Sequence, residues 1–247
     1  MIAFPNCKIN LGLHILRKRE DGYHDLETVF YPLPWLDVLE VIQSESFQFT
    51  SSGLQIPVSA EENICTKAYE LIKTDFDLPP VHIHLHKVIP SGAGLGGGSA
   101  DGAFTLKLLN KKFNLGLSEA QLIDYALKLG SDCPIFIINK PCFASGRGEK
   151  LITIDLDLSN YKIVVVHPAI HIPTAWAFQQ LQLTAKTISI KQAIQHPITE
   201  WNGLNENDFE KPVFERYPEI KSLKEMLVSK GALFASLTGS GSAVFAI

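Results

Sequence analysis

Residues 90–100 have the sequence Pro90-Ser91-Gly92-Ala93-Gly94-Leu95-Gly96-Gly97-Gly98-Ser99-Ala100, and they are the most informative segment of the chain. Before them, residues 81–89 alternate apolar and polar side chains, which predicts a half-buried strand. After them, residues 101–114 place apolar side chains at helical spacing. A glycine-rich turn between a strand and a helix directs backbone N–H groups and the positive end of the helix dipole to one point. We therefore predict an anion-binding loop, most simply for the phosphates of a nucleotide.

Three interpretations of this segment compete. A flexible linker explains its glycines, but not its place between a strand and an apolar-faced helix. A dinucleotide-binding fold is suggested by Gly92, Gly94 and Gly97, which satisfy G-x-G-x-x-G. That fold also needs an acidic residue about 20 positions on at the end of a second strand, where this chain has a turn and a helix start. A kinase loop outside the Walker class remains, because G-x-x-x-x-G-K-[ST] occurs nowhere in the chain.

Composition limits the class of protein. The 247 residues are 46% hydrophobic and 19% charged, as in an ordinary globular protein of one large or two modest domains. The net charge of −4 gives no indication of binding to nucleic acid or to an anionic membrane. The four cysteines form no C-x-x-C pair, as expected for reduced thiols. With neither the apolar run of a signal peptide nor an 18-residue apolar segment, we expect a soluble cytoplasmic protein.

The N-terminal part of the chain predicts antiparallel strands and one helix. Residues 3–16 form a strand pattern in which Lys8 and Asn10 share a face, and the pattern alone does not distinguish a half-exposed face from a functional one. Strand pattern returns over residues 26–42, interrupted at Pro32 and Pro34, and residues 61–76 predict a helix. The alternating histidines of residues 82–86 are spread too far along one strand to surround one metal ion, so we predict a polar strand surface.

The middle of the chain predicts a helix from Glu119 to Leu129, a turn at residues 130–134 and a strand at residues 135–138. Asp132 lies in that turn and has two interpretations, as a turn-forming or helix-capping residue and as a carboxylate at the rim of a site. A nucleophilic cysteine at Cys7 or Cys133 is disfavoured, because no histidine or asparagine pairing is indicated nearby. From about residue 155 the pattern is strand, helix, helix, strand, with Thr174 as a possible helix cap and a small-residue loop before the last strand.

Five motifs occur in order along nearly the whole chain, and together they resemble the GHMP kinases. They are Pro5-x-x-Lys8-x-Asn10, Asp21-Gly22-Tyr23-His24, the 90–100 loop, Gly130-Ser131-Asp132-Cys133-Pro134 and Thr238-Gly239-Ser240-Gly241. The resemblance departs at Cys7, Ala93 and Asp101, where the family often has Ala, Gly and Asn. It implies an α+β two-domain GHMP kinase fold, with an N-terminal ribosomal protein S5 domain 2-like domain (1–154) and a C-terminal ferredoxin-like α/β sandwich (155–247).

The resemblance also implies an activity. The D-G-Y-H element narrows it to members that transfer the γ-phosphoryl group of ATP, with Mg²⁺, to the 2-hydroxyl of a cytidylyl-methylerythritol substrate. Lys8 would stabilise transition-state charge and Asp132 would accept or orient the hydroxyl proton. The implied nucleotide-binding residues are Asn63 near the adenine and Pro90, Ser91, Gly92, Ala93, Gly94, Leu95, Gly96, Gly97, Gly98, Ser99 and Ala100. The implied substrate-binding residues are Tyr23, His24 and Phe178 for the cytosine and Asn10 and Thr174 for the erythritol.

Two rival functions remain open at the level of sequence. A kinase of the same fold acting on mevalonate, homoserine or a sugar would keep Lys8, Asp132 and the loop, but has no use for a cytosine site at Tyr23 and His24. A catalytically silent nucleotide sensor would keep the loop, yet it has no reason to retain both Lys8 and Asp132. Ser99 is a candidate metal ligand by its position in the loop only, and the sequence assigns no oligomeric state.

Overall fold

Segments from distant parts of the sequence combine into two packing units in the computed structural model, which describes residues 1–247. The first unit contains Met1–Lys8, Pro32–Ser91 and Gly96–Lys140. The second contains Ile9–Tyr31, Gly92–Leu95 and Pro141–Ile247. The glycine-rich segment therefore contributes residues to both units. The expected boundary between residues 154 and 155 divides the chain in sequence order instead, and it stays a prediction.

The first unit is built on a four-stranded sheet in the order β1-β4-β6-β5. β6 (Val81–Lys87) pairs antiparallel with β4 (Val38–Gln43) and parallel with β5 (Gln48–Gly53), and β1 (Ile2–Ala3) lies at the other edge. The predicted alternation of β6 is confirmed, because its apolar side chains are buried and its histidines are not. Hydroxyls of Thr50 and Ser52 lie 2.7–3.0 Å from nitrogens of these histidines, which form the expected polar strand surface.

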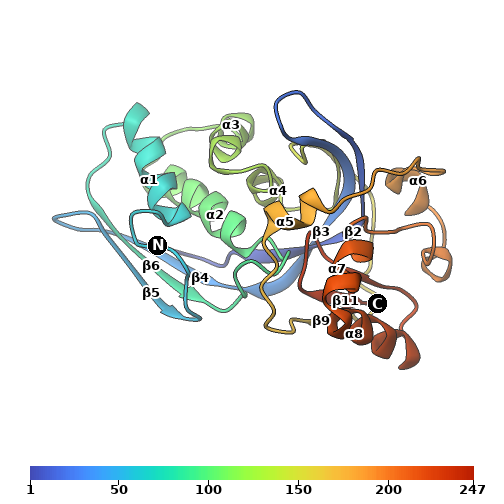
Figure 1. The fold of residues 1–247 in the computed structure, drawn as a ribbon. Helices are drawn as coiled ribbons and strands as arrows, with labels where there is room; N and C mark the ends of the chain where they lie inside the picture. Colours follow the sequence, from blue (N-terminus) through green and yellow to red (C-terminus); the bar gives the residue numbers. More distant parts are fainter. The chain divides into compact units, whose positions relative to one another are not determined.

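Helices α1 (Ile64–Asp75), α2 (Gly97–Lys112), α3 (Glu119–Leu129) and α4 (Cys133–Ile138) gather on one side of this sheet (Figure 1). Their starts follow local capping chemistry. The Asn63 side chain accepts from the Cys65 N–H at 2.8 Å, and Ser118 with Gln121 forms a capping box at α3. The predicted bounds of α3 are confirmed, and α2 begins four residues earlier than predicted, inside the glycine run.

The strand predicted over residues 135–138 is wrong, because these residues belong to α4. Pro134 occupies the first turn of this helix, where a missing N–H costs nothing, and residues 133–137 are buried. A helix that is buried all round has no polar face, and a short apolar run then looks the same as a buried strand. Lys107 of α2 completes the end of α4 by donating to the carbonyls of Phe136 and Ile137 at 3.4 and 3.3 Å.

A second sheet has the order β2-β3-β7-β8. Its strands are β2 (Asn6–Lys18), β3 (His24–Leu36), β7 (Cys142–Gly146) and β8 (Lys150–Thr153). β3 runs through Pro32 and Pro34 without the predicted interruption. Its pairing with β7 ends at Phe30, so no β7 carbonyl requires a donor from the prolines.

The C-terminal part of the second unit contains a three-stranded antiparallel sheet in the order β10-β11-β9. Its strands are β9 (Val164–Val166), β10 (Ala235–Leu237) and β11 (Val244–Ala246). α7 (Glu210–Arg216) packs on α8 (Pro218–Ser229), and α8 packs on β10 and β11 (Figure 1). The connections include α5 (Thr174–Gln179), α6 (Ile190–Ala193) and a 3₁₀ turn at Ile198–Glu200. The helices of this chain are all too short or too polar to span a bilayer.

Candidate active site

Lys8 is the third residue of β2, and its side chain is buried in the interior of the first unit. It is 2% exposed, and its Nζ lies 3.5 Å from Oδ2 of Asp132. Burial lowers the pKa of Lys8, while the charge and hydrogen bond of Asp132 act in the opposite direction. The half-exposed alternative for this strand face is therefore wrong at Lys8, which is a buried cation held beside a carboxylate.

Asp132 stands at the N-terminal end of α4, but its side chain does not cap that helix. The carboxylate is 40% exposed and is directed to Lys8. This geometry removes the helix-capping interpretation of Asp132 and leaves its carboxylate available to a ligand. An exposed carboxylate beside a buried ammonium is a suitable pair for accepting a hydroxyl proton next to developing negative charge.

The glycine-rich segment enters α2 directly beside Lys8. Gly96 has φ of +71°, and a Cβ there would lie 2.9 Å from Cζ of Phe136 and 3.1 Å from Cε of Lys8. No side chain caps α2 at this end, so the N–H groups of its first turn stay free for an anion. Ser99 in the same turn lies close to the Cys133 thiol, next to Asp132. The first unit thus brings together Lys8, Asp132 and the uncapped helix start.

The middle of the segment, Gly92–Leu95, packs within the second unit on the small-residue loop that follows β10. Gly94 has φ of +79°, and a Cβ there would lie 2.0 Å from the Thr238 carbonyl oxygen. The Thr238 hydroxyl is 3.1 Å from the Gly94 carbonyl oxygen, to which it donates, and the Ala243 N–H donates to Ala93 at 3.1 Å. Ala93 and Leu95 are each 1% exposed, whereas Ser91, Gly92 and Gly98 are open to solvent.

Asn10 belongs to the same network and is 1% exposed. Its backbone N–H donates to the Thr238 hydroxyl and its amide donates to the Thr28 hydroxyl, each at 3.0 Å. No individual role for Thr28 or Thr238 was predicted from the sequence. The motif Thr238-Gly239-Ser240-Gly241 was the only signal for Thr238, and nothing local marked Thr28.

The three aromatic residues expected at a cytosine behave differently from one another. His24 stacks on Phe178 with ring centroids 4.9 Å apart, and Phe178 meets Phe209 edge to face at 4.9 Å. Burial, followed by the charge of Lys18, lowers the pKa of His24, which favours the neutral ring. Tyr23 is 53% exposed and lies instead under the guanidinium of Arg147, 4.6 Å from its ring centroid. Since His24 and Phe178 already stack directly, no base fits between those two rings.

Thr174 and Asn63 are the remaining predicted residues. Thr174 is the first residue of α5, but Pro173 occupies the N-cap position and no side chain caps the helix, so the predicted threonine cap is wrong. The exposed Thr174 hydroxyl instead lies 3.2 Å from that of Ser240. Asn63 is 3% exposed and its carbonyl oxygen caps α1, which leaves its predicted place near an adenine a prediction.

The cysteines have the character of core residues. All four are buried and free. Burial raises the pKa of Cys7 to about 11 and that of Cys133 to about 12, so neither thiol ionises readily at neutral pH. The interpretation of a nucleophilic cysteine finds no support in these surroundings.

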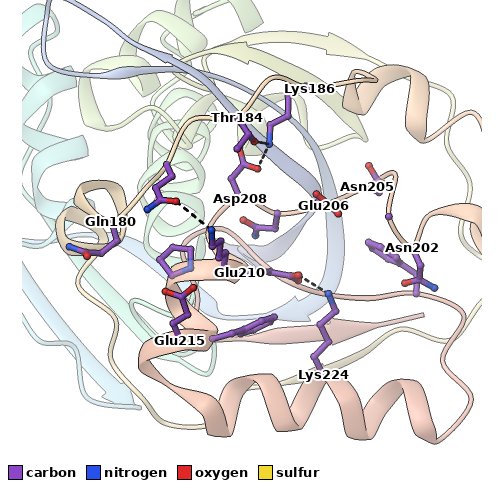
Figure 2. A pocket seen from close by; sticks show the side chains of 17 residues that line it. Gln180, Thr184, Lys186, Asn202, Asn205, Glu206, Asp208, Glu210, Glu215 and Lys224 are labelled. Carbon is purple, nitrogen blue, oxygen red and sulfur yellow. Dashed lines mark hydrogen bonds and ion pairs between the residues drawn. The ribbon is translucent and has the colours of Figure 1, made fainter.

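A cleft of about 560 Å³ in the second unit contains none of the predicted site residues (Figure 2). Two of its lysines are neutralised within its walls. Lys186 pairs with Asp208, and Lys224 pairs with Glu210 at 2.6 Å. Because these two lysines are already paired with carboxylates and only Lys211 is left to meet a phosphate, this cleft is a poorer phosphate site than the free helix start of α2.

Family models match two parts of the chain. The GHMP kinases N terminal domain matches residues 63–140, and the GHMP kinases C terminal domain matches residues 190–247. The fold of mevalonate kinase is shared as well, with a TM-score of 0.72 at 13% identity over 99% of this chain and 90% of that structure. These matches confirm the expected α+β GHMP kinase fold.

Relatives that match the full length of this chain indicate which branch of the GHMP kinases it resembles. A protein of Bacteroides fragilis (strain YCH46) named 4-diphosphocytidyl-2-C-methyl-D-erythritol kinase is 52% identical over 251 residues, covering 100% of this chain and 92% of the relative. A crystal structure of 4-(cytidine 5'-diphospho)-2C-methyl-D-erythritol kinase has a TM-score of 0.84 at 30% identity, covering 100% of this chain and 90% of that one. The chain belongs to the GHMP kinase family, in the branch of these full-length relatives.

Proposed function

We propose that this chain transfers the γ-phosphoryl group of ATP to the 2-hydroxyl of 4-diphosphocytidyl-2-C-methyl-D-erythritol, in the non-mevalonate route to isoprenoid precursors. The observation that carries the proposal is the meeting of Lys8, Asp132 and the uncapped start of α2 in a chain whose relatives with this name match it over its full length. A likeness in fold alone, such as that to mevalonate kinase at 13% identity, would leave the acceptor open.

The residues of the first unit supply what phosphoryl transfer needs, which is positioning and charge stabilisation. The free N–H groups at the start of α2 would hold phosphate oxygens. Lys8, paired with Asp132, would stabilise the charge that develops on the transferred group. Asp132 would accept the proton of the substrate hydroxyl or orient that hydroxyl by a hydrogen bond.

The substrate-binding roles stay proposals. Tyr23 is supported as a stacking surface by its exposure, and Phe178 by its half-buried ring at the edge of the apolar core of the second unit. His24 would form hydrogen bonds with an edge of the base, because a neutral imidazole has both a donor and an acceptor nitrogen. Asn10 is better placed to hold the loop through Thr238 than to reach a ligand with a free amide.

Mg²⁺ is proposed as the metal that accompanies ATP. No group of three His, Cys, Asp or Glu side chains forms a metal site in this chain. Mg²⁺ does not require such a group, because it typically keeps several waters and is held through substrate phosphates with one or two carboxylates. When bound, the ion would neutralise charge on the phosphates, and no ligand of this chain is assigned to it. A cytoplasmic location is likewise a proposal that rests on the sequence.

A direct comparison of acceptors tests the proposed function. ATP consumption is measured with the cytidylyl substrate, mevalonate, homoserine and galactose at equal concentrations, with the Asp132→Asn protein as a control for contaminating ATPases. We expect turnover with the cytidylyl substrate alone, and loss of that turnover in the control. Turnover with another acceptor and none with the cytidylyl substrate would assign the chain to a different GHMP kinase activity.

A further inference from the structure

A buried ionic triad lies at the base of the glycine-rich segment, within the first unit. Lys87, the last residue of β6, places its Nζ 2.5 Å from Oδ2 of Asp37 and 2.8 Å from Oδ2 of Asp101. Asp37 immediately precedes β4, and Asp101 lies in the second turn of α2. All three side chains are at most 2% exposed. The triad therefore joins the strand that leads into the segment to the helix that leaves it.

The segment has two stems, which are residues 88–89 before it and the first turns of α2 after it, and each stem is held by more than one contact. Oδ1 of Asp37 accepts the N–H groups of Val88 and Ile89 at 2.5 and 2.8 Å, and these are the two residues that separate β6 from Pro90. On the other stem, a Cβ at Gly97 would lie 3.0 Å from Nζ of Lys87, so the ammonium packs against the first turn of α2. The direction of both stems is thus specified by one cation and its two carboxylates.

Stability alone does not explain this arrangement. Apolar residues of similar volume commonly replace buried ion pairs at no loss of stability, because desolvation offsets their attraction. Here two carboxylates share one ammonium, and Oδ1 of Asp101 is buried without a hydrogen-bond partner. Burial raises the pKa of Asp101 to about 7, which is a sign of that cost. A costly polar cluster is more readily understood as a specification of geometry.

We propose that the Asp37–Lys87–Asp101 triad is a positioning device for ATP binding. It fixes the end of β6 relative to the start of α2, and so aims the free N–H groups of that helix at the nucleotide phosphates. None of the three side chains touches ATP. The inference rests on the proposed use of the segment as a phosphate site, but it concerns affinity for the nucleotide and not the identity of the acceptor.

The test removes the link between the stems without leaving a charge unpaired. Asp101→Leu is close to the native shape and leaves Lys87 paired with Asp37, whereas Asp101→Asn retains an acceptor for the ammonium. Thr105→Val is the matched control, because it deletes a buried hydrogen bond in α2, from the Thr105 hydroxyl to the Asp101 carbonyl, away from the triad side chains. The dissociation constant of a non-hydrolysable ATP analogue with Mg²⁺ is measured for each full-length protein, together with the melting temperature and the KM of the acceptor.

We expect Asp101→Leu to weaken binding of the analogue by about tenfold or more, since small misplacements of a binding group are costly. Asp101→Asn and Thr105→Val should stay within about threefold of the wild type, and the acceptor KM should move little in any of them. Wild-type affinity in a folded Asp101→Leu protein, or an equal loss in Thr105→Val, would overturn the proposal. Binding of the analogue needs no acceptor. The triad proposal can therefore be tested even if the protein proves inactive on the cytidylyl substrate.

A second variant and a measurement on the wild type test the proposal if the Asp101→Leu protein does not fold. The Lys87→Met/Asp101→Leu protein removes the paired charges together and leaves Asp37 bonded to two backbone N–H groups, and we expect the same loss of affinity. If neither variant folds, amide hydrogen exchange of the wild type decides. The hydrogen-bonded amides of Val88, Ile89 and the second turn of α2 should open as one cooperative unit, and opening on the two sides of the segment at clearly different free energies would contradict a shared clamp.

Discussion

Asp132 is the residue on which the chemistry of the site depends. Its carboxylate lies 3.5 Å from the buried Lys8 ammonium and makes no bond to its own helix. We expect Asp132→Asn to lower kcat by about 10² or more, because the amide keeps the shape but cannot accept the proton. Nucleotide affinity should persist. Asp124→Asn, an exposed carboxylate on α3, is the control and should leave kcat unchanged.

A near-wild-type kcat in Asp132→Asn would return Asp132 to a purely structural role in its turn. The comparison is made at saturating concentrations of both substrates, so that a change in binding does not imitate a change in the chemical step.

Tyr23 offers the cleanest test of the cytosine site. Phe178 packs on Phe209 in the core, so shortening it would mix lost stability with lost binding, whereas Tyr23 is 53% exposed. Stacking of a base on an aromatic ring contributes about 1–3 kcal/mol, so Tyr23→Ala should raise the KM of the cytidylyl substrate about 5- to 150-fold. The ATP KM and the melting temperature should stay unchanged. Tyr161→Ala, which is 42% exposed, serves as the control, and equal rises of both KM values would contradict a cytosine role for Tyr23.

At the scale of elements, the turn from the glycine-rich segment into α2 depends on Gly96. A side chain there meets Phe136 and Lys8 and must also adopt φ of +71°. We expect Gly96→Val to lose about 2–5 kcal/mol of stability, from backbone strain and overpacking together, and to weaken ATP binding by tenfold or more. Denaturant titration and analogue binding measure the two effects.

Gly116→Val is the control for backbone strain alone. Gly116 has the same φ of +71° but no neighbour within 4 Å of a built Cβ. It should lose about 1–2 kcal/mol of stability without a change in nucleotide affinity. Unchanged nucleotide affinity in a folded Gly96→Val protein would mean that the start of α2 is not the phosphate site.

The elements also show where sequence patterns succeed. The strand β6 and the helix α3 follow from alternation and from the Ser118 capping box, which are properties of neighbouring residues. The start of α2 inside a run of glycines could not be predicted in this way. Glycine has a low helix propensity, and only tertiary packing holds those residues in a helix. The helix α4 was missed because its neighbours, and not its own residues, bury every face.

At the scale of the whole molecule, Asp101 makes stability depend on pH. Burial raises its pKa to about 7, whereas an unfolded chain releases that proton near pH 4. Between these values the folded protein binds more protons than the unfolded one, so stability falls as pH rises from about 4 to about 7 and stays lower above it. Asp101→Asn removes this dependence and should be more stable than the wild type at pH 8.

Chemical denaturation of the two proteins at several pH values between 4.5 and 8 checks this expectation. The difference in unfolding free energy should grow with pH over this range and level off above pH 7. A difference that is constant with pH would mean that Asp101 titrates normally and is ionised in the folded protein throughout.

The sequence by itself determined the anion-binding segment, the family and most regular elements, because these depend on residues that are neighbours in the chain. The tertiary structure decided which side chains meet. It buried Lys8 against Asp132, joined Asn10 to Thr238 across 228 positions and assembled Asp37, Lys87 and Asp101 under the loop. Burial and long-range pairing set the ionisation and orientation of these groups, and no local pattern of residues contains that information.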